Sequence, residues 1–170
     1  MKVLGIDPGL KGALCYLDDT DKPIVTPMPT IKIRKKNCID VDKIAEYITS
    51  LDKDTKVLIE RQVVIQGQGL SSSSRTMMMF GQLIGICAGA GFVYRDITAY
   101  KWQRIIFPSI DESKMVQYNY KETKIKSIAF VTQTYGLNYC FSNTRQRKPQ
   151  DGLADAICIA KAGHLLKKWN

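Results

Sequence analysis

Four acidic residues stand where their carboxylates could act together. Asp7 ends the apolar run 3–6, Glu60 ends the run 57–59, and Asp151 and Asp155 lie four residues apart at the start of a last apolar helix pattern. Carboxylates held at short range raise one another's pKa unless a cation neutralises them. Hard divalent cations such as Mg²⁺, with Mn²⁺ as a substitute, prefer oxygen ligands. Two such ions about 4 Å apart can activate a water and stabilise the leaving oxygen of a phosphodiester, so the acids predict a two-metal hydrolytic site.

Each acid also has a purely structural explanation. Asp7 could close its turn through an Asx-type hydrogen bond, Glu60 could be a surface charge at a strand end, and Asp151 could be a favourable acid at a helix start. Asp155 is harder to explain in this way, because it lies one turn into the helix between two alanines. The metal site would be absent only if the structural explanation were true for all four acids at once.

The elements expected around the acids form a mixed α/β domain that spans residues 1–170. Three opening strands are expected to form an antiparallel meander, and helices should flank the central sheet. The expected strands are 3–6, 12–17, 24–28, 57–60 and 92–97, and the expected helices are 41–51, 76–89, 98–106, 121–134 and 151–169. If the strands that end at Asp7 and Glu60 are parallel neighbours, both carboxylates emerge at the sheet edge where α/β folds bind ligands.

Two segments between these elements allow more than one interpretation. Residues 66–75 are rich in glycine and serine and are expected to form a loop, suited either to contacts with DNA or to a plain connection. Gly81, Gly85 and Gly89 recur every four residues and form one stripe on the following helix. We expect this stripe to pack tightly in the core, with a subunit contact as the alternative.

Composition restricts the class of function. The chain has 170 residues and a formal net charge of +9, which predicts a polyanionic partner, although a basic surface that serves solubility would look the same. A single histidine, His164, excludes a Ser-His-Asp triad and a multi-histidine zinc site. Five cysteines without CxxC spacing indicate neither a disulfide framework nor a zinc ribbon. No signal peptide or membrane span is indicated, so we expect a soluble intracellular protein with no membrane contact.

Basic residues gather in the segment 32–36, at Lys114, in the run 121–126, and just before Asp151. The last group could hold a phosphate next to the metals, and contacts of this kind position a duplex without reading its sequence. A solvated surface is the alternative for each group. The residues predicted to contact DNA are Arg75, Lys121, Lys124, Arg145, Arg147 and Lys148. Tyr100 and Trp102 could stack on bases, but core packing is the favoured interpretation.

Three motifs resemble RuvC-type Holliday junction resolvases, which belong to the RNase H-like (retroviral integrase) superfamily. They are Gly5-Ile-Asp-Pro-Gly9, the pair Ile59-Glu60, and the segment 151–160, which reads DGLADAICIA. The first motif alone is shared with sugar kinase-like ATPases, whereas the combination in this order is more specific. Two features depart from the bacterial pattern, since the last two acids are four rather than three apart and no aromatic residue follows Glu60 closely. The departures resemble a phage, viral or organellar branch.

The resemblance implies an RNase H-like fold and a homodimer that binds four-way DNA junctions and makes paired symmetric nicks with divalent metal. Asp7, Glu60, Asp151 and Asp155 would then be the metal-binding catalytic acids. Two alternatives remain open: a nuclease of the same fold that acts on forks, flaps or RNA, and a protein without nuclease activity. The second could be a DNA-binding scaffold or an actin-like ATPase, although the latter needs a second phosphate-binding motif that the sequence lacks.

Overall fold

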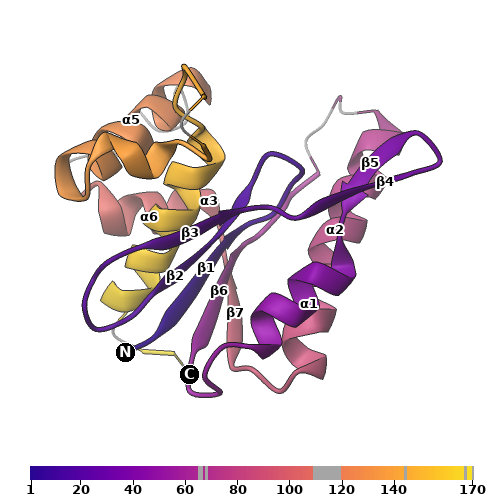
Figure 1. Cartoon of the computed structure of the whole chain (residues 1–170), viewed down its shortest axis with the longest axis horizontal. Coiled ribbons are helices and arrows are strands. Elements are labelled where there is room, and N and C mark those ends of the chain that lie inside the picture. The colour runs from indigo at the N-terminus through magenta and orange to yellow at the C-terminus, as the bar shows by residue number, and fades with distance from the viewer. Residues whose placement is uncertain (65–66, 68, 109–119, 144, 167, 170) are drawn as a thin grey trace.

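A five-stranded mixed sheet forms the centre of the computed structural model (Figure 1), which describes residues 1–64, 67, 69–108, 120–143, 145–166 and 168–169, with no side-chain surroundings for 120–124. Its strand order is β3-β2-β1-β6-β7. The central strand β1 pairs antiparallel with β2 and parallel with β6, and β7 extends the parallel half. The bounds are β1 Val3–Asp7, β2 Ala13–Leu17, β3 Ile24–Pro27, β6 Lys56–Glu60 and β7 Tyr94–Ile97. The expected opening meander and mixed sheet are confirmed.

Helices cover both faces of this sheet. Successive side chains of β1 point to opposite sides, so they pack against different helices. Leu4 and Ile6 pack with residues of α1 and α2, whereas Val3 belongs to the core formed with α3, α5 and α6 (Figure 1). The helix bounds are α1 Val41–Thr49, α2 Leu70–Gly89, α3 Ala99–Ile106, α5 Tyr120–Thr134 and α6 Asp151–Leu165, and a short 3₁₀ helix spans Leu137–Cys140. The layers are therefore helix, sheet and helix.

Two helices begin at a residue whose side chain caps the first turn. The Asp40 side chain accepts a hydrogen bond from the Lys43 backbone N–H at 3.2 Å, and the Thr98 hydroxyl accepts one from Lys101 at 3.4 Å. Each bond satisfies a backbone donor that the first helical turn leaves free. Of the described helices, none is long and apolar enough to cross a membrane.

The expectation of a loop over residues 66–75 is wrong for its second half, because α2 already begins at Leu70. Ser73 is buried, and Met79 and Phe80 further along anchor the helix in the core. Burial of this face outweighs the modest cost of serine in a helix, since packing often overrides intrinsic propensity. Arg75 therefore projects from a helix and not from a loop.

The glycine stripe of α2 also differs from expectation. Gly81, Gly85 and Gly89 are exposed, and a Cβ added to any of them would meet nothing within 4 Å. The stripe does not pack in the core; the core side of α2 consists of larger residues such as Leu83 and Cys87. The glycines instead share the open side of the helix with Met77 and Met78, which are 41% and 54% exposed.

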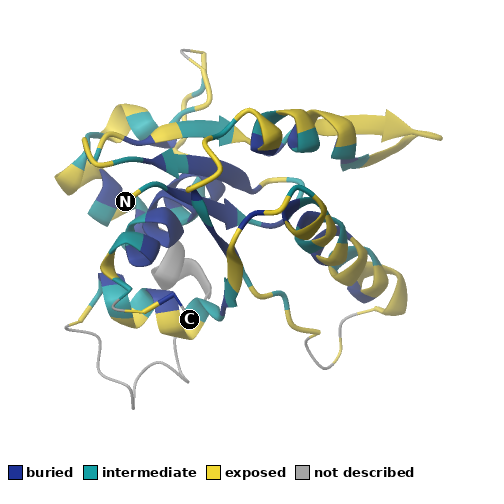
Figure 2. Ribbon diagram, turned by 90° about the horizontal axis from the view of Figure 1, so that it is seen from below, coloured by how far each residue is buried: buried dark blue, intermediate teal, exposed yellow. Residues whose placement is uncertain are grey.

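A β-hairpin separate from the central sheet was not expected from the sequence. Its strands are β4, Thr30–Ile33, and β5, Lys36–Ile39, which pair only with each other. The hairpin follows β3 and extends away from the rest of the structure (Figure 1 and Figure 2). The two residues at its tip, Arg34 and Lys35, have φ values of 47° and 67°.

Candidate active site

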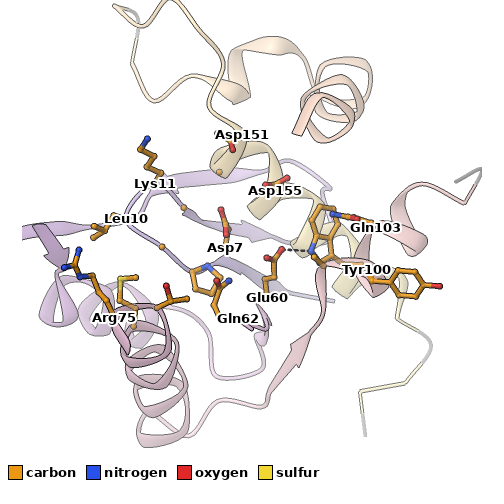
Figure 3. A pocket seen from close by; sticks show the side chains of 18 of the residues that line it. Asp7, Leu10, Lys11, Glu60, Gln62, Arg75, Tyr100, Gln103, Asp151 and Asp155 are labelled. Atoms are coloured by element: carbon orange, nitrogen blue, oxygen red, sulfur yellow. Dashed lines mark hydrogen bonds between the residues drawn. The ribbon is translucent and has the colours of Figure 1, made fainter. Parts of the chain in front are cut away.

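All four predicted acids line one cavity of about 700 Å³ at the carboxyl ends of β1 and β6 (Figure 3). Asp7 and Glu60 are the last residues of these parallel strands, whose register pairs Ile6 with Ile59. Asp151 and Asp155 enter the cavity from the first turns of α6. The structure therefore brings together residues from the beginning, the middle and the end of the described chain.

Glycine at two positions allows α6 to come this close to β1. A Cβ on Gly5 would lie 2.3 Å from the backbone nitrogen of Ala160, and a Cβ on Gly152 would lie 2.0 Å from the carbonyl oxygen of Lys11. Real Cβ contacts are longer, so any side chain at these positions would push the helix from the strand and its turn. Because Gly5 and Gly152 have no side chains, α6 lies close enough to β1 for its two acids to share a cavity with Asp7.

Trp102 holds the carboxylate of Glu60. The indole Nε1 donates to Oε2 of Glu60 at 2.7 Å (dashed line in Figure 3), and the Trp102 side chain is only 1% exposed. Burial raises the pKa of Glu60 above its ordinary value, and the indole N–H opposes this rise because it stabilises the charged form. One oxygen of Glu60 is thus fixed by α3 while the side chain faces the cavity.

The cavity also contains basic and amide side chains. Arg75 lines it from α2 and Lys126 from α5, and Lys11 lines it from the turn after β1. Gln62 and Gln103 add amide groups to the lining, and Ser72 and Thr76 add hydroxyl groups. Arg75 was predicted to contact the substrate, whereas Lys11, Gln62 and Gln103 were not singled out, because no local pattern distinguishes them from ordinary surface residues.

The other predicted DNA contacts lie outside this cavity or outside the described side chains. Arg145, Arg147 and Lys148 are exposed in the segment that leads into α6, and none of the three is among the residues lining the cavity. Lys121 and Lys124 are in the first turns of α5, where only the backbone is described, and Lys114 lies outside the described residues.

Trp102 is buried, which confirms the core interpretation over base stacking, although it also bonds Glu60. For Tyr100 the core interpretation is wrong, because this residue is 40% exposed beside the cavity. His164 is half-buried near the other end of α6, with Nε2 at 3.2 Å from the carbonyl oxygen of Leu17, in agreement with a structural role.

The donor chemistry of the cavity fits a hard divalent cation. Its potential ligands are carboxylate oxygens, and neither cysteine nor histidine lines it. The buried carboxylate of Glu60, whose pKa is raised by desolvation, would be stabilised in its charged form by a neighbouring cation. Within the described part of the chain, no three acidic, histidine or cysteine side chains are close enough to bind one ion as they stand. Binding would therefore draw the carboxylates of the cavity together.

Comparison with solved structures assigns the fold. Thermus thermophilus RuvC aligns over 95% of this chain and 92% of its own with a TM-score of 0.52 and 16% identity. T. thermophilus RuvC in complex with a Holliday junction substrate aligns over 95% and 91%, with a TM-score of 0.57 and 14% identity. The chain has the fold of RuvC.

The expected RNase H-like architecture is thereby confirmed at the level of the RuvC fold. The yeast mitochondrial Holliday junction resolvase Ydc2 aligns over 94% of this chain and 76% of its own at 16% identity and a TM-score of 0.49, and the assignment does not depend on it. No protein family and no curated protein matches the sequence. At these identities the RuvC comparison fixes the fold, and the function must be argued from the residues of the cavity.

Proposed function

We propose that this protein is a divalent-metal-dependent endonuclease that resolves four-way DNA junctions. The observation that carries the proposal is the convergence of Asp7, Glu60, Asp151 and Asp155 on one cavity at the carboxyl edge of a RuvC-like sheet. Nearby Arg75, the net charge of +9 and the exposed basic segments favour a polyanionic substrate. RuvC of this fold has been solved with a Holliday junction substrate, which favours branched DNA over other nucleic acids.

In this proposal the four acids hold two Mg²⁺ or Mn²⁺ ions, which supply the activation of water and the stabilisation of the leaving oxygen in phosphodiester hydrolysis. The roles of the other residues follow from their positions. Trp102 orients Glu60 through the indole N–H, so that the second carboxylate oxygen remains available. Arg75 and Lys126, on opposite helices of the cavity, are placed to hold the phosphate that is cut.

Paired symmetric nicks require two active sites related by a two-fold axis, so we propose a homodimer. The exposed side of α2 is the surface that we propose for the contact. It combines three glycines that present no side chain with Met77, Met78 and Leu70, which is 85% exposed. Open backbone next to flexible apolar side chains allows two helices to approach closely.

The test measures cleavage and binding on the same preparations. Asp7→Asn, Glu60→Gln and Asp155→Asn keep the shape of the side chain but remove the charge that would hold the metal, and each should abolish Mg²⁺-dependent cleavage of a labelled four-way junction. Junction binding should persist or tighten, because the loss of a carboxylate reduces repulsion of the phosphates. Asp151→Asn could leave partial activity if this residue reaches the metal through water.

Asp42→Asn is the matched control, since Asp42 is exposed in the first turn of α1 and outside the cavity. It should cut and bind like the parent protein. Fork, flap, linear duplex and RNA–DNA hybrid substrates in the same assay separate junction resolution from a broader nuclease activity. If the Asp7 and Asp155 variants cut as the parent does, the metal-site reasoning is wrong.

A further inference from the structure

The hairpin formed by β4 and β5 carries a concentrated positive charge. Residues 30–39 contain Lys32, Arg34, Lys35 and Lys36 and no acidic residue. All four basic residues are exposed, and every residue of β4 is exposed. Figure 2 shows the hairpin at the right-hand end of the structure, with little of its surface covered. A solvated surface with no partner would more often mix both signs of charge.

The backbone at the tip of the hairpin has a conformation that is unfavourable for the two residues found there. Ile33 pairs with Lys36, so Arg34 and Lys35 form a two-residue turn in which both residues have positive φ. Such turns strongly prefer Asn-Gly or Asp-Gly, since a side chain with a Cβ is disfavoured in this region. Here the tip carries two long cationic side chains instead. Strain of this kind persists where the residues serve another purpose.

The hairpin starts at the sheet edge that carries the candidate active site. Asp7 pairs with Ala13, and Ala13 pairs with Pro27 at the end of β3, so the chain leaves the sheet level with Asp7. The Met28 N–H then donates to the carbonyl oxygen of Gly12 at 2.9 Å, and the Asp40 N–H donates to Pro29 at 2.8 Å. The first bond ties the base of the hairpin to the turn beside the cavity, and the second closes the base between the two ends of the hairpin. Four residues of β4 reach about 13 Å further, the length of roughly four base pairs.

We propose that the β4–β5 hairpin is a DNA-binding arm that contacts the phosphate backbone of a duplex running out from the candidate active site. Its partner is double-stranded DNA, because the arm offers only positive charge and lies outside the cavity in which the cut would occur. The proposal rests on the proposed function for the choice of DNA as the polyanion. Arg34 and Lys35 contact phosphates at the tip, and Lys32 and Lys36 contact phosphates nearer the base.

The test uses a double variant, Arg34→Asn with Lys35→Gly, called the tip variant. It gives the turn the Asn-Gly pair that such turns prefer. The double variant should fold at least as well as the parent, so a loss of binding cannot be attributed to unfolding; thermal unfolding checks this. The matched control is Lys22→Gln with Lys168→Gln. Both lysines are exposed and lie beyond the opposite end of the sheet, after β2 and near the start of β7.

Affinity for a linear duplex and for a four-way junction is measured against salt concentration in EDTA, so that no cleavage occurs. If each tip residue neutralises one phosphate, the steepness of the fall of log K with log salt should be about 1.8 smaller for the tip variant than for the parent. Its affinity near 0.1 M salt should be about 60-fold lower. The control should lose much less.

Each result has a definite meaning. If the tip variant and the control bind with the same affinity and slope as the parent, the arm is overturned while the nuclease proposal stands. If the tip variant loses affinity but the parent never cuts DNA with Mg²⁺, the arm stands and the nuclease proposal falls. If the variant changes the oligomeric state in sedimentation and leaves DNA affinity intact, the hairpin binds a second copy and the proposed arm is wrong. A parent that binds no DNA overturns both.

Discussion

Replacement of Trp102 by Phe isolates one hydrogen bond in the candidate active site. Phe keeps most of the buried ring but removes the N–H that lies 2.7 Å from the Glu60 carboxylate. Glu60 is already desolvated, and loss of the N–H raises its pKa further because the charged form loses its donor. A carboxylate whose charged form is less stable, and whose side chain is free to rotate, then binds a metal ion less tightly.

The magnitude follows from the type of bond. A hydrogen bond to a charged group contributes about 1.5–3 kcal/mol, which corresponds to roughly 10–100-fold in an equilibrium constant. Partners that orient metal ligands have effects of about the same size on metal affinity. We therefore expect Trp102→Phe to raise the Mg²⁺ concentration for half-maximal junction cleavage about 10–100-fold, with partial recovery of the rate at high Mg²⁺.

Trp169→Phe is the matched control, because Trp169 is also buried and its indole donates to the backbone carbonyl of Gly163, at 3.2 Å. Both variants should lose stability through the same change in ring size. Only the Trp102 variant should shift the Mg²⁺ titration, measured under single-turnover conditions, and the Mn²⁺ affinity of the DNA-free protein. If both variants lose similar stability and neither shifts metal dependence, Trp102 is only a core residue and the reasoning fails.

Three further predictions follow from the described contacts. Gly5→Ala should destabilise the protein by about 3 kcal/mol or more in denaturant unfolding, because its Cβ would overlap the α6 backbone; an unchanged midpoint would contradict the close approach. Gly85→Ala should stabilise the protomer by about 0.5–1 kcal/mol, since nothing lies near the new methyl group, while weakening a dimer that packs on α2; sedimentation distinguishes the two effects. Joint replacement of the exposed basic residues before α6 by Ala should flatten the salt dependence of junction binding, and an unchanged slope would remove them from the DNA surface; they are Arg145, Arg147 and Lys148.

The sequence predicted the strands of the central sheet and the position of the acids well, for physical reasons. Short apolar runs that end in Asp7 and Glu60 identify buried strands, and two parallel neighbours must deliver their last side chains to one edge. The pattern of α6 likewise placed Asp155 between apolar residues of a helix. These features depend on local periodicity, which a single sequence displays directly.

Features that depend on contacts between distant residues were missed or misjudged. The bond between Trp102 and Glu60 joins residues 42 positions apart, and nothing near Trp102 indicates it. The start of α2 was placed too late because burial of its inner side, and not its serine-rich composition, decides where that helix begins. The open glycine stripe was placed in the core for a related reason: spacing shows that glycines share one side of a helix but not which way that side faces.

The close packing of α6 on β1 has a consequence for the synthesis of the protein. Asp7 is synthesised well before Asp151 and Asp155, which follow only with the last described helix. At about 5–20 residues per second, roughly 7–30 s separate the first acid from the last two. Under the proposed function, a nascent chain could already present the β4–β5 hairpin while it still lacks half of its metal ligands. Under the same proposal, the ability to cut DNA would appear only once α6 has been made and has packed on β1.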